Sequence, residues 1–268
     1  MTAASVPPGA LPAQVPRAGA LYRFAAEAAF TVFSLQNWRY DVTGLDHVPT
    51  SGGAVIAANH TSFWDFFTIG RPIYRAFGRP IRIMAKESLF RMPVFGWLMT
   101  QAEHIPVHRG GGTEALSSAL AALRAGELVL ILPEQTISTS FDLLPFKAGA
   151  ARLAAAAGVP LIPAASWGSH RFHTVGRLPR PHWRLPVSVG FGAALLPGPG
   201  ADPLAVTDEL RTSVRGVLDE LQARYPEQPM PGKDWWVPSR LGGSAPDHGE
   251  SLRQYHEHQD RWRQRNAG

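Results

Sequence analysis

The feature that most constrains the fold is a regular alternation of short apolar runs with longer segments of helical spacing. Runs typical of strands, short and rich in apolar and β-branched residues, occupy residues 38–42, 54–58, 81–85, 105–109, 128–132, 159–163 and 186–191. Helical spacing is found at residues 93–99, 113–125, 147–158 and 202–224. This alternation predicts an α/β fold, a single domain with a mostly parallel central sheet flanked by helices.

The composition limits the possible functions. The chain has 268 residues, 45% hydrophobic and 18% charged, so it can bury the core of one large domain. It has no cysteine, which excludes disulfides, thiolate nucleophiles and thiolate metal sites and fits a cytosolic compartment. The net charge of +5 suits anionic partners such as phosphate-bearing substrates or lipid surfaces, or equally an ordinary solvated face. No basic run is dense enough to favour nucleic acid.

Both ends of the chain differ from its centre in composition. Residues 1–20 are rich in Ala, Pro and Gly, so we expect a mobile leader without a secretory signal. The apolar segment at residues 21–37 predicts a helix too short to span a bilayer, which lies at the membrane interface or packs on the domain's own core. Residues 241–268 are a polar C-terminal tail with a helical stretch at residues 249–265.

A histidine and an aspartate follow the strand predicted at residues 54–58. His60 and Asp65 lie where this strand gives way to an aromatic-rich segment that can begin a helix. The carboxyl end of a strand is where α/β sheets bind ligands, and histidine is the side chain best suited to proton transfer near neutral pH. Asp65 can orient the imidazole, or it can cap the new helix together with Ser62. Both interpretations are open at this point.

Other histidines and glycines are interpreted as structural. His104 and His108 are four residues apart, a metal-ligand spacing on a helix, but their segment reads as extended and contains Pro106. We therefore predict no metal site. Residues 110–112 are three glycines without the lysine and hydroxyl of a phosphate loop, and we expect a flexible connection.

Four short motifs occur in a recognisable order. They are residues 59–65 (NHTSFWD), 104–109 (HIPVHR), 133–136 (PEQT) and 159–163 (VPLIP). In this order they resemble the motifs of the glycerolipid acyltransferase family, in the branch that includes the 1-acylglycerol-3-phosphate acyltransferases. Residues 146–149 (FKAG) and 167–170 (WGSH) are similar to the actinobacterial form. The resemblance covers about residues 38–240, and this segment is expected to be the acyltransferase domain.

The resemblance implies a role for each matching residue. His60 is the general base that takes the proton from the acceptor hydroxyl as it attacks an acyl thioester, and Asp65 orients and charge-stabilises it. Arg109 and Lys147 hold the acceptor's phosphate. The other acceptor-binding residues are Glu134, beside the glycerol portion, and its neighbours Gln135 and Thr136. Neither a metal ion nor an organic cofactor is implied, because the donor is itself activated as acyl-CoA or acyl carrier protein.

The chain departs from the family pattern around the acceptor. Gln135 stands where the family has glycine, and His108 replaces the aspartate before Arg109. Thr139 stands where the actinobacterial form supplies an arginine. The changes remove phosphate-binding groups and leave the base intact. They keep open an acceptor without phosphate, such as a glycolipid, an amino-lipid or a secondary metabolite, and also a lipid-binding homologue without turnover.

The function expected from these observations is that of an O-acyltransferase in phospholipid biosynthesis. It transfers a fatty acyl group from acyl-CoA or acyl carrier protein to the hydroxyl of a lysophospholipid, 1-acylglycerol-3-phosphate in the main hypothesis. Its partners are the thioester donor, the lysophospholipid acceptor and a membrane surface, without nucleic acid. We expect peripheral or monotopic attachment at the cytoplasmic face of the cell membrane.

Overall fold

A computed structural model describes residues 19–108 and 112–266, and its centre is a seven-stranded sheet of order β1-β7-β6-β2-β5-β3-β4. All neighbouring strands are parallel except β6 and β7, which confirms the mostly parallel sheet. The strands are β1 (Arg39–Thr43), β2 (Ala54–Ala58), β3 (Ile81–Lys86), β4 (Ile105–Val107), β5 (Leu128–Ile131), β6 (Leu161–Trp167) and β7 (Pro186–Phe191). The predicted leader falls almost wholly, and Arg109 entirely, outside the described residues.

Helices connect and cover the strands. They are α1 (Ala20–Leu35), α2 (Asp65–Phe77), α3 (Glu87–Phe90), α4 (Pro93–Gln101), α5 (Gly112–Arg124), α6 (Gly149–Ala157), α7 (Pro203–Ala223) and α8 (His248–Asn266). Their ends follow local chemistry. Gly78 and Gly158 end α2 and α6 in the left-handed conformation, and the Asp202 carboxylate caps α7 by accepting the Leu204 N–H at 3.0 Å.

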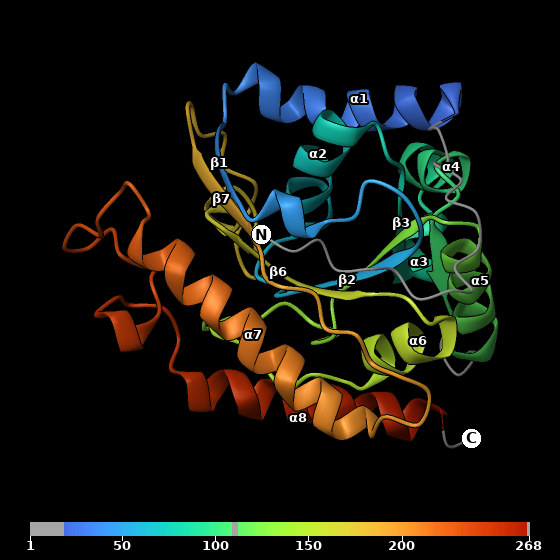
Figure 1. Cartoon of the computed structure of the whole chain (residues 1–268). Helices are drawn as coiled ribbons and strands as arrows, with labels where there is room; N and C mark the ends of the chain where they lie inside the picture. The colour runs from blue at the N-terminus through green and yellow to red at the C-terminus, as the bar shows by residue number, and fades with distance from the viewer. Residues whose placement is uncertain (1–18, 109–111, 267–268) are drawn as a thin grey trace, which may run out of the picture.

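The domain has three layers (Figure 1), with α1 and α2 on one face of the sheet and α5, α6 and α7 on the other. Strand β2 is buried over its whole length, and its side chains alternate between the two faces. Val55 and Ala57 belong to the core under α5–α7, whereas Ile56 and Ala58 belong to the core under α1 and α2. A strand packed on both faces has a continuous run of apolar residues, which is why this strand could be predicted from the sequence.

Five parallel strands end at the same edge of the sheet. Because β2, β3, β4, β5 and β6 run in one direction, the segments that follow them meet beyond their carboxyl ends. The motifs around His60, Glu134 and Ser169 follow β2, β5 and β6 respectively. The topology therefore gathers residues from distant parts of the sequence at one edge, as α/β folds do at their binding sites.

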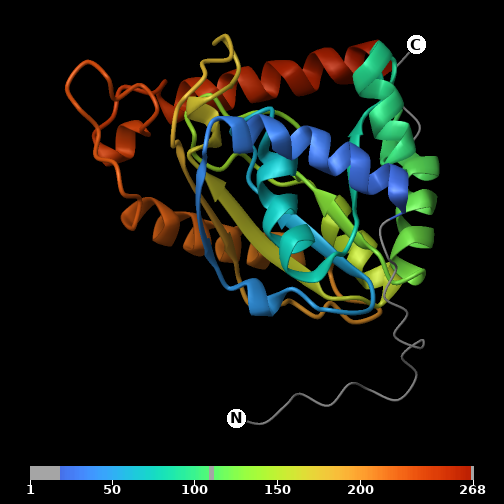
Figure 2. The ribbon, with the colours of Figure 1, turned by 90° about the horizontal axis from the view of Figure 1, so that it is seen from above.

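Two C-terminal features differ from a simple tail. The segment between α7 and α8 loops out at one end of the domain, and α8 then runs along its outside (Figure 1; Figure 2). Helix α8 packs on the domain through Ser251 and Tyr255, which are buried. Trp236, in the preceding segment, is also buried. The end of the chain thus contributes to the same globular unit.

Candidate active site

The turn that carries His60 is positioned by the side chain of Asn59. Its Nδ2 donates to the Ser166 carbonyl at 3.0 Å, and its Oδ1 accepts the Ser166 N–H at 2.8 Å. These bonds imitate a strand pairing and prolong the contact of β2 with β6 by one residue. The backbone then leaves the sheet at His60, whose N–H and C=O are both held, by the Glu134 carboxylate and the Ser138 N–H at 2.8 Å each.

His60 and Asp65 form a direct pair. The His60 Nδ1 lies 3.0 Å from the Asp65 Oδ2, with 15% of the His60 side chain exposed and none of Asp65. Because a carboxylate can only accept, Nδ1 carries the proton, and in the neutral imidazole Nε2 keeps its lone pair. Among the described residues no side chain is hydrogen-bonded to Nε2. The Nε2 of His60 is therefore available as a proton acceptor.

Asp65 is both a histidine partner and an acceptor of backbone N–H groups in the turn before α2. Its Oδ2 also accepts the N–H groups of Thr61 and Ser62, at 2.7 and 2.8 Å. The two interpretations of Asp65 are thus compatible, since one oxygen does both. Its Oδ1 accepts the Ser169 hydroxyl at 2.8 Å. Ser169 is fully buried and was not predicted as a site residue, although it lies in the WGSH segment that resembles the family.

Glu134 is a buried organiser of the loops in this structure. It is 1% exposed, and its two carboxylate oxygens accept the N–H groups of His60 and Leu144, at 2.8 and 2.9 Å. Burial raises the pKa of Glu134 to about 8, and the two N–H donors oppose that rise. This geometry indicates a role in fixing the His60 turn, and the contact with the acceptor's glycerol portion stays a prediction.

Gln135 occupies a conformation that suits glycine. Its φ is +60°, in the left-handed region, and its side chain is exposed. The family's glycine at this position therefore has a conformational reason here, beyond close backbone approach. Thr136 beside it is half-buried. The turn closes through the Gln135 N–H, which donates to the Leu132 carbonyl at 3.1 Å.

Helix α8 contacts the residues where the phosphate site was predicted. The Thr139 hydroxyl lies 3.1 Å from both the Ser251 hydroxyl and the Gln254 Oε1. The Lys147 Nζ lies 5.7 Å from the centre of the Tyr255 ring, a cation–π distance. The structure thus brings Thr139 and Lys147 to the same helix.

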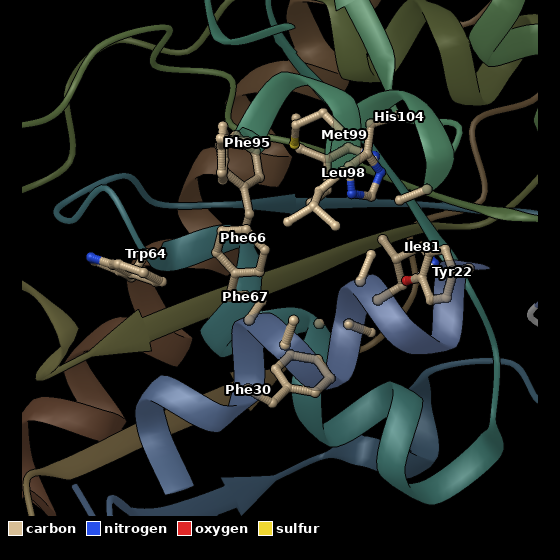
Figure 3. Close-up of a pocket in the computed structure, with 17 residues that line it drawn as sticks. Tyr22, Phe30, Trp64, Phe66, Phe67, Ile81, Phe95, Leu98, Met99 and His104 are labelled. Atoms are coloured by element: carbon tan, nitrogen blue, oxygen red, sulfur yellow. Dashed lines mark hydrogen bonds between the residues drawn. The ribbon is translucent and has the colours of Figure 1, made fainter. Parts of the chain in front are cut away.

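An apolar cavity of about 180 Å³ lies beside the His60 turn, enclosed by α1, α2, α4 and β3. Figure 3 shows α1 with Tyr22 and Phe30 on one side and α4 with Leu98 on the other. The Phe66 ring lines this cavity and lies 5.9 Å from the His60 ring, measured between centroids. The cavity therefore approaches the candidate base.

Two polar side chains of the cavity wall, those of Tyr22 and His104, are neutral and already bonded. Tyr22 Oη accepts the Ile81 N–H at 2.9 Å, and His104 Nδ1 accepts the Ile83 N–H at 3.3 Å. Burial lowers the pKa of His104 to about 3 and raises the pKa of Tyr22 to about 12, so both stay uncharged at neutral pH. The cavity is therefore suited to a hydrocarbon chain. Among the residues that the structure describes, no group of three or more His, Asp and Glu side chains could hold a metal ion.

The fold and the site together define an α/β protein with a histidine–aspartate pair at the carboxyl edge of its sheet, next to an apolar cavity. Comparison with known proteins agrees with this class. The model of the acyltransferase family matches residues 39–167. A 1-acyl-sn-glycerol-3-phosphate acyltransferase of Bacillus subtilis is 33% identical over 149 residues, which are 55% of this chain and 72% of that protein. The chain therefore belongs to the glycerolipid acyltransferase family.

Two further comparisons define the extent of the likeness. A chloroplastic 1-acyl-sn-glycerol-3-phosphate acyltransferase of Brassica napus is 28% identical over 159 residues, 58% of this chain but 45% of that protein. The chain thus spans less than half of this plant relative. The crystal structure of the 1-acyl-sn-glycerophosphate acyltransferase PlsC from Thermotoga maritima superimposes with a TM-score of 0.62 at 23% identity, covering 77% of this chain and 81% of that one. This likeness shows a shared fold.

Proposed function

We propose that this protein transfers a fatty acyl group from an acyl thioester, acyl-CoA or acyl carrier protein, to the hydroxyl of 1-acylglycerol-3-phosphate. The observation that carries the proposal is the His60–Asp65 pair, with the open Nε2 of His60 beside an apolar cavity. Family membership and the names of the relatives support the same activity. Phospholipid biosynthesis is the process in which such a reaction serves.

The reaction needs one base and no covalent enzyme intermediate. His60 Nε2 takes the proton of the acceptor hydroxyl while the hydroxyl oxygen attacks the thioester carbonyl. Asp65 stabilises the resulting imidazolium, because its carboxylate lies 3.0 Å from Nδ1. The tetrahedral intermediate then collapses, the C–S bond breaks and the thiolate recovers the proton from His60. The acyl chain of the donor or acceptor lies in the cavity between α1 and α4.

The exposed apolar side chains of α1 and α4 support attachment to a membrane. Leu21, Phe24 and Leu35 of α1 are 52%, 62% and 74% exposed, and Val94 and Trp97 of α4 are 74% and 49% exposed. These helices flank the cavity, so binding their apolar faces at a bilayer interface brings the cavity to its lipid substrates. No helix in the described part of the chain has the length and apolar character needed to cross a membrane. We propose peripheral attachment at the cytoplasmic face.

The test is acyl transfer from labelled acyl-CoA of several chain lengths, in mixed micelles, to 1-acylglycerol-3-phosphate and to a panel of neutral acceptors. The variant is His60→Ala, and the matched control is His256→Ala, at an exposed position on α8. Loss of a general base is expected to lower kcat by about 10²- to 10⁴-fold, with an unchanged thermal melt.

Turnover by His60→Ala near the wild-type rate contradicts this mechanism. Transfer to neutral acceptors alone moves the protein to the alternative acceptor class that Gln135 and Thr139 suggest. Absence of any transfer is to be followed by acyl carrier protein donors before the lipid-binding alternative is accepted.

A further inference from the structure

A second cavity, of about 150 Å³, lies between the Glu134 loop, the β6–β7 connection and the C-terminal segment. Five residues of its wall carry polar side chains, and a sixth supplies an aromatic ring. The polar ones are Thr139, Thr174, Arg177, Ser244 and Gln254, and the aromatic ring is that of Trp235. The wall therefore differs in kind from that of the apolar cavity, and suits a small polar group.

This second cavity adjoins the loop that carries His60 on two sides. The Thr174 hydroxyl, which is buried, donates to the Thr61 carbonyl at 2.7 Å. On the other side the Ser138 N–H donates to the His60 carbonyl at 2.8 Å, and Thr139 follows directly in the chain. A group bound in the cavity thus lies next to the turn that bears the proposed base.

Arg177 is the single charged side chain in the described wall of this cavity. A tight turn places it there: its N–H donates to the Thr174 carbonyl at 3.2 Å, and Gly176 between them has a φ of +74°. That φ is the value a type II turn requires at its third position, where glycine is preferred. Since Thr174 is bonded to the His60 loop, the turn also fixes Arg177 relative to that loop.

The guanidinium of Arg177 is oriented but not neutralised. Its Cζ lies 3.8 Å from the centre of the Trp235 ring, a stacking distance that leaves its N–H edges free. None of the ion pairs formed among the described residues involves Arg177. The neighbouring carboxylate of Asp234 does not pair with Arg177; its Oδ1 accepts the Ser244 hydroxyl at 2.8 Å. A planar cation whose donors are free is well matched to a phosphate.

We propose that this second cavity binds a phosphate group of a substrate and that Arg177 supplies the cation which Thr139 does not. The inference rests on the proposed acyl transfer for its choice of ligand. It assigns the phosphate contact to segments outside the 39–167 family match, namely the β6–β7 connection, the Trp235 segment and α8. On this assignment, the departure from the family pattern at Thr139 is compensated from another loop.

The experiment measures binding by calorimetry to the purified full-length chain, so that it does not depend on turnover. The probes are glycerol 3-phosphate, which carries the acceptor's phosphate, coenzyme A, which carries the donor's phosphates, and glycerol as the neutral control. The variant is Arg177→Gln. The matched control is Arg180→Gln, an exposed arginine of the same connection outside the cavity wall.

We expect the wild type and Arg180→Gln to bind glycerol 3-phosphate equally, glycerol not measurably, and Arg177→Gln to bind about 10- to 100-fold more weakly, the usual effect of losing a charged hydrogen bond. A loss confined to coenzyme A supports the same site with the donor as the source of the phosphate. Equal binding of both phosphate probes by Arg177→Gln and the wild type overturns the inference, as does a wild type that binds neither.

The transfer assay separates this inference from the proposed function. With an active enzyme, Arg177→Gln is expected to raise the KM for 1-acylglycerol-3-phosphate by a similar factor and to change kcat little, because Arg177 takes no part in the proton transfer. If Arg177→Gln transfers acyl groups with an unchanged kcat and KM, the phosphate site is contradicted and the proposed acyltransferase activity is not. If the chain shows no transfer activity but Arg177→Gln loses the phosphate binding of the wild type, the phosphate site stands and the proposed acyl transfer is contradicted.

Discussion

Replacing Asp65 with asparagine separates the charge of the site from its geometry. Three donors converge on Oδ2, from His60, Thr61 and Ser62, and the Ser169 hydroxyl meets Oδ1. Asparagine can keep its amide oxygen at the Oδ2 position and turn its NH₂ toward the Ser169 hydroxyl, which can accept as well as donate. We therefore expect the variant to fold and to hold His60 in the same tautomer, while the carboxylate charge is lost.

The size of the effect follows from the separation of the charges. With Nδ1 3.0 Å from Oδ2, the centres of an imidazolium and the carboxylate lie close together. At about 4 Å, opposite unit charges attract by about 4 kcal/mol at an effective dielectric constant near 20. The amide dipole recovers part of this, so Asp65→Asn is expected to lose about 3 kcal/mol of transition-state stabilisation. That corresponds to about 10²-fold in kcat, with little change in KM because resting His60 is uncharged in this mechanism.

The assay is steady-state acyl transfer with saturating donor, alongside a thermal melt of each variant. Asp41→Asn is the control, because that carboxylate is half-exposed on the edge strand β1. A kcat within threefold of wild type for Asp65→Asn would refute the reasoning, since the imidazolium would then need no counter-charge.

Two further predictions concern stability. Gln135 adopts a left-handed backbone conformation that costs a non-glycine residue about 1 kcal/mol, and Gln135→Gly removes this strain. Glycine also makes the unfolded chain more flexible, which offsets part of the gain in stability, so Tm should rise by about 1–2 °C. Gln135→Ala keeps the strain, and equal melts for the two variants would contradict the explanation. Burial lowers the pKa of His170 from 6.5 to about 4, so the unfolded state takes up a proton first as the pH falls. The protein therefore loses stability below pH 6.5, by about 2 kcal/mol at pH 5 from this residue. His170→Gln can still donate to the Trp236 carbonyl and should reduce the decline by that amount in urea melts; an unchanged slope would count against it.

The elements that the sequence predicted best are those whose cause is local. Strand β2 ends at Ala58 as expected, because a doubly buried strand is a continuous apolar run and Asn59 interrupts it. The structure brings His60 and Asp65 together, and the sequence could indicate this because they are only five positions apart and a helix begins at Asp65. Both inferences need no knowledge of distant parts of the chain.

The extent of β6 depends on its neighbours. The apolar pattern indicated a strand at residues 159–163, whereas β6 runs from Leu161 to Trp167. Ala164, Ala165 and Ser166 have weak strand preference of their own. They are extended because β7 pairs with all three of them, and β2 pairs with Ala164 on the other side. Periodicity within the segment carries no sign of these partners.

The site residues that the sequence did not assign come from far along the chain. Ser169 meets Asp65 across 104 positions, and the Thr139 and Lys147 contacts with α8 join segments more than 100 positions apart. A side chain can be assigned to such a site only once strand order is known. The role of Glu134 was predicted from resemblance, which indicates that the residue matters but not which way its carboxylate points.

The pairing of β1 has a consequence for how the chain folds while it is being made. Among the described residues, β1 pairs with β7 alone, which lies about 150 residues further along the chain. At ~5–20 residues per second, a ribosome needs about 7–30 s to deliver that partner. During that interval α1 and β1 have been synthesised but the edge of the sheet cannot close. The exposed apolar side chains of α1 are therefore present before the domain is complete, and the membrane attachment proposed for them can begin before the chain has folded.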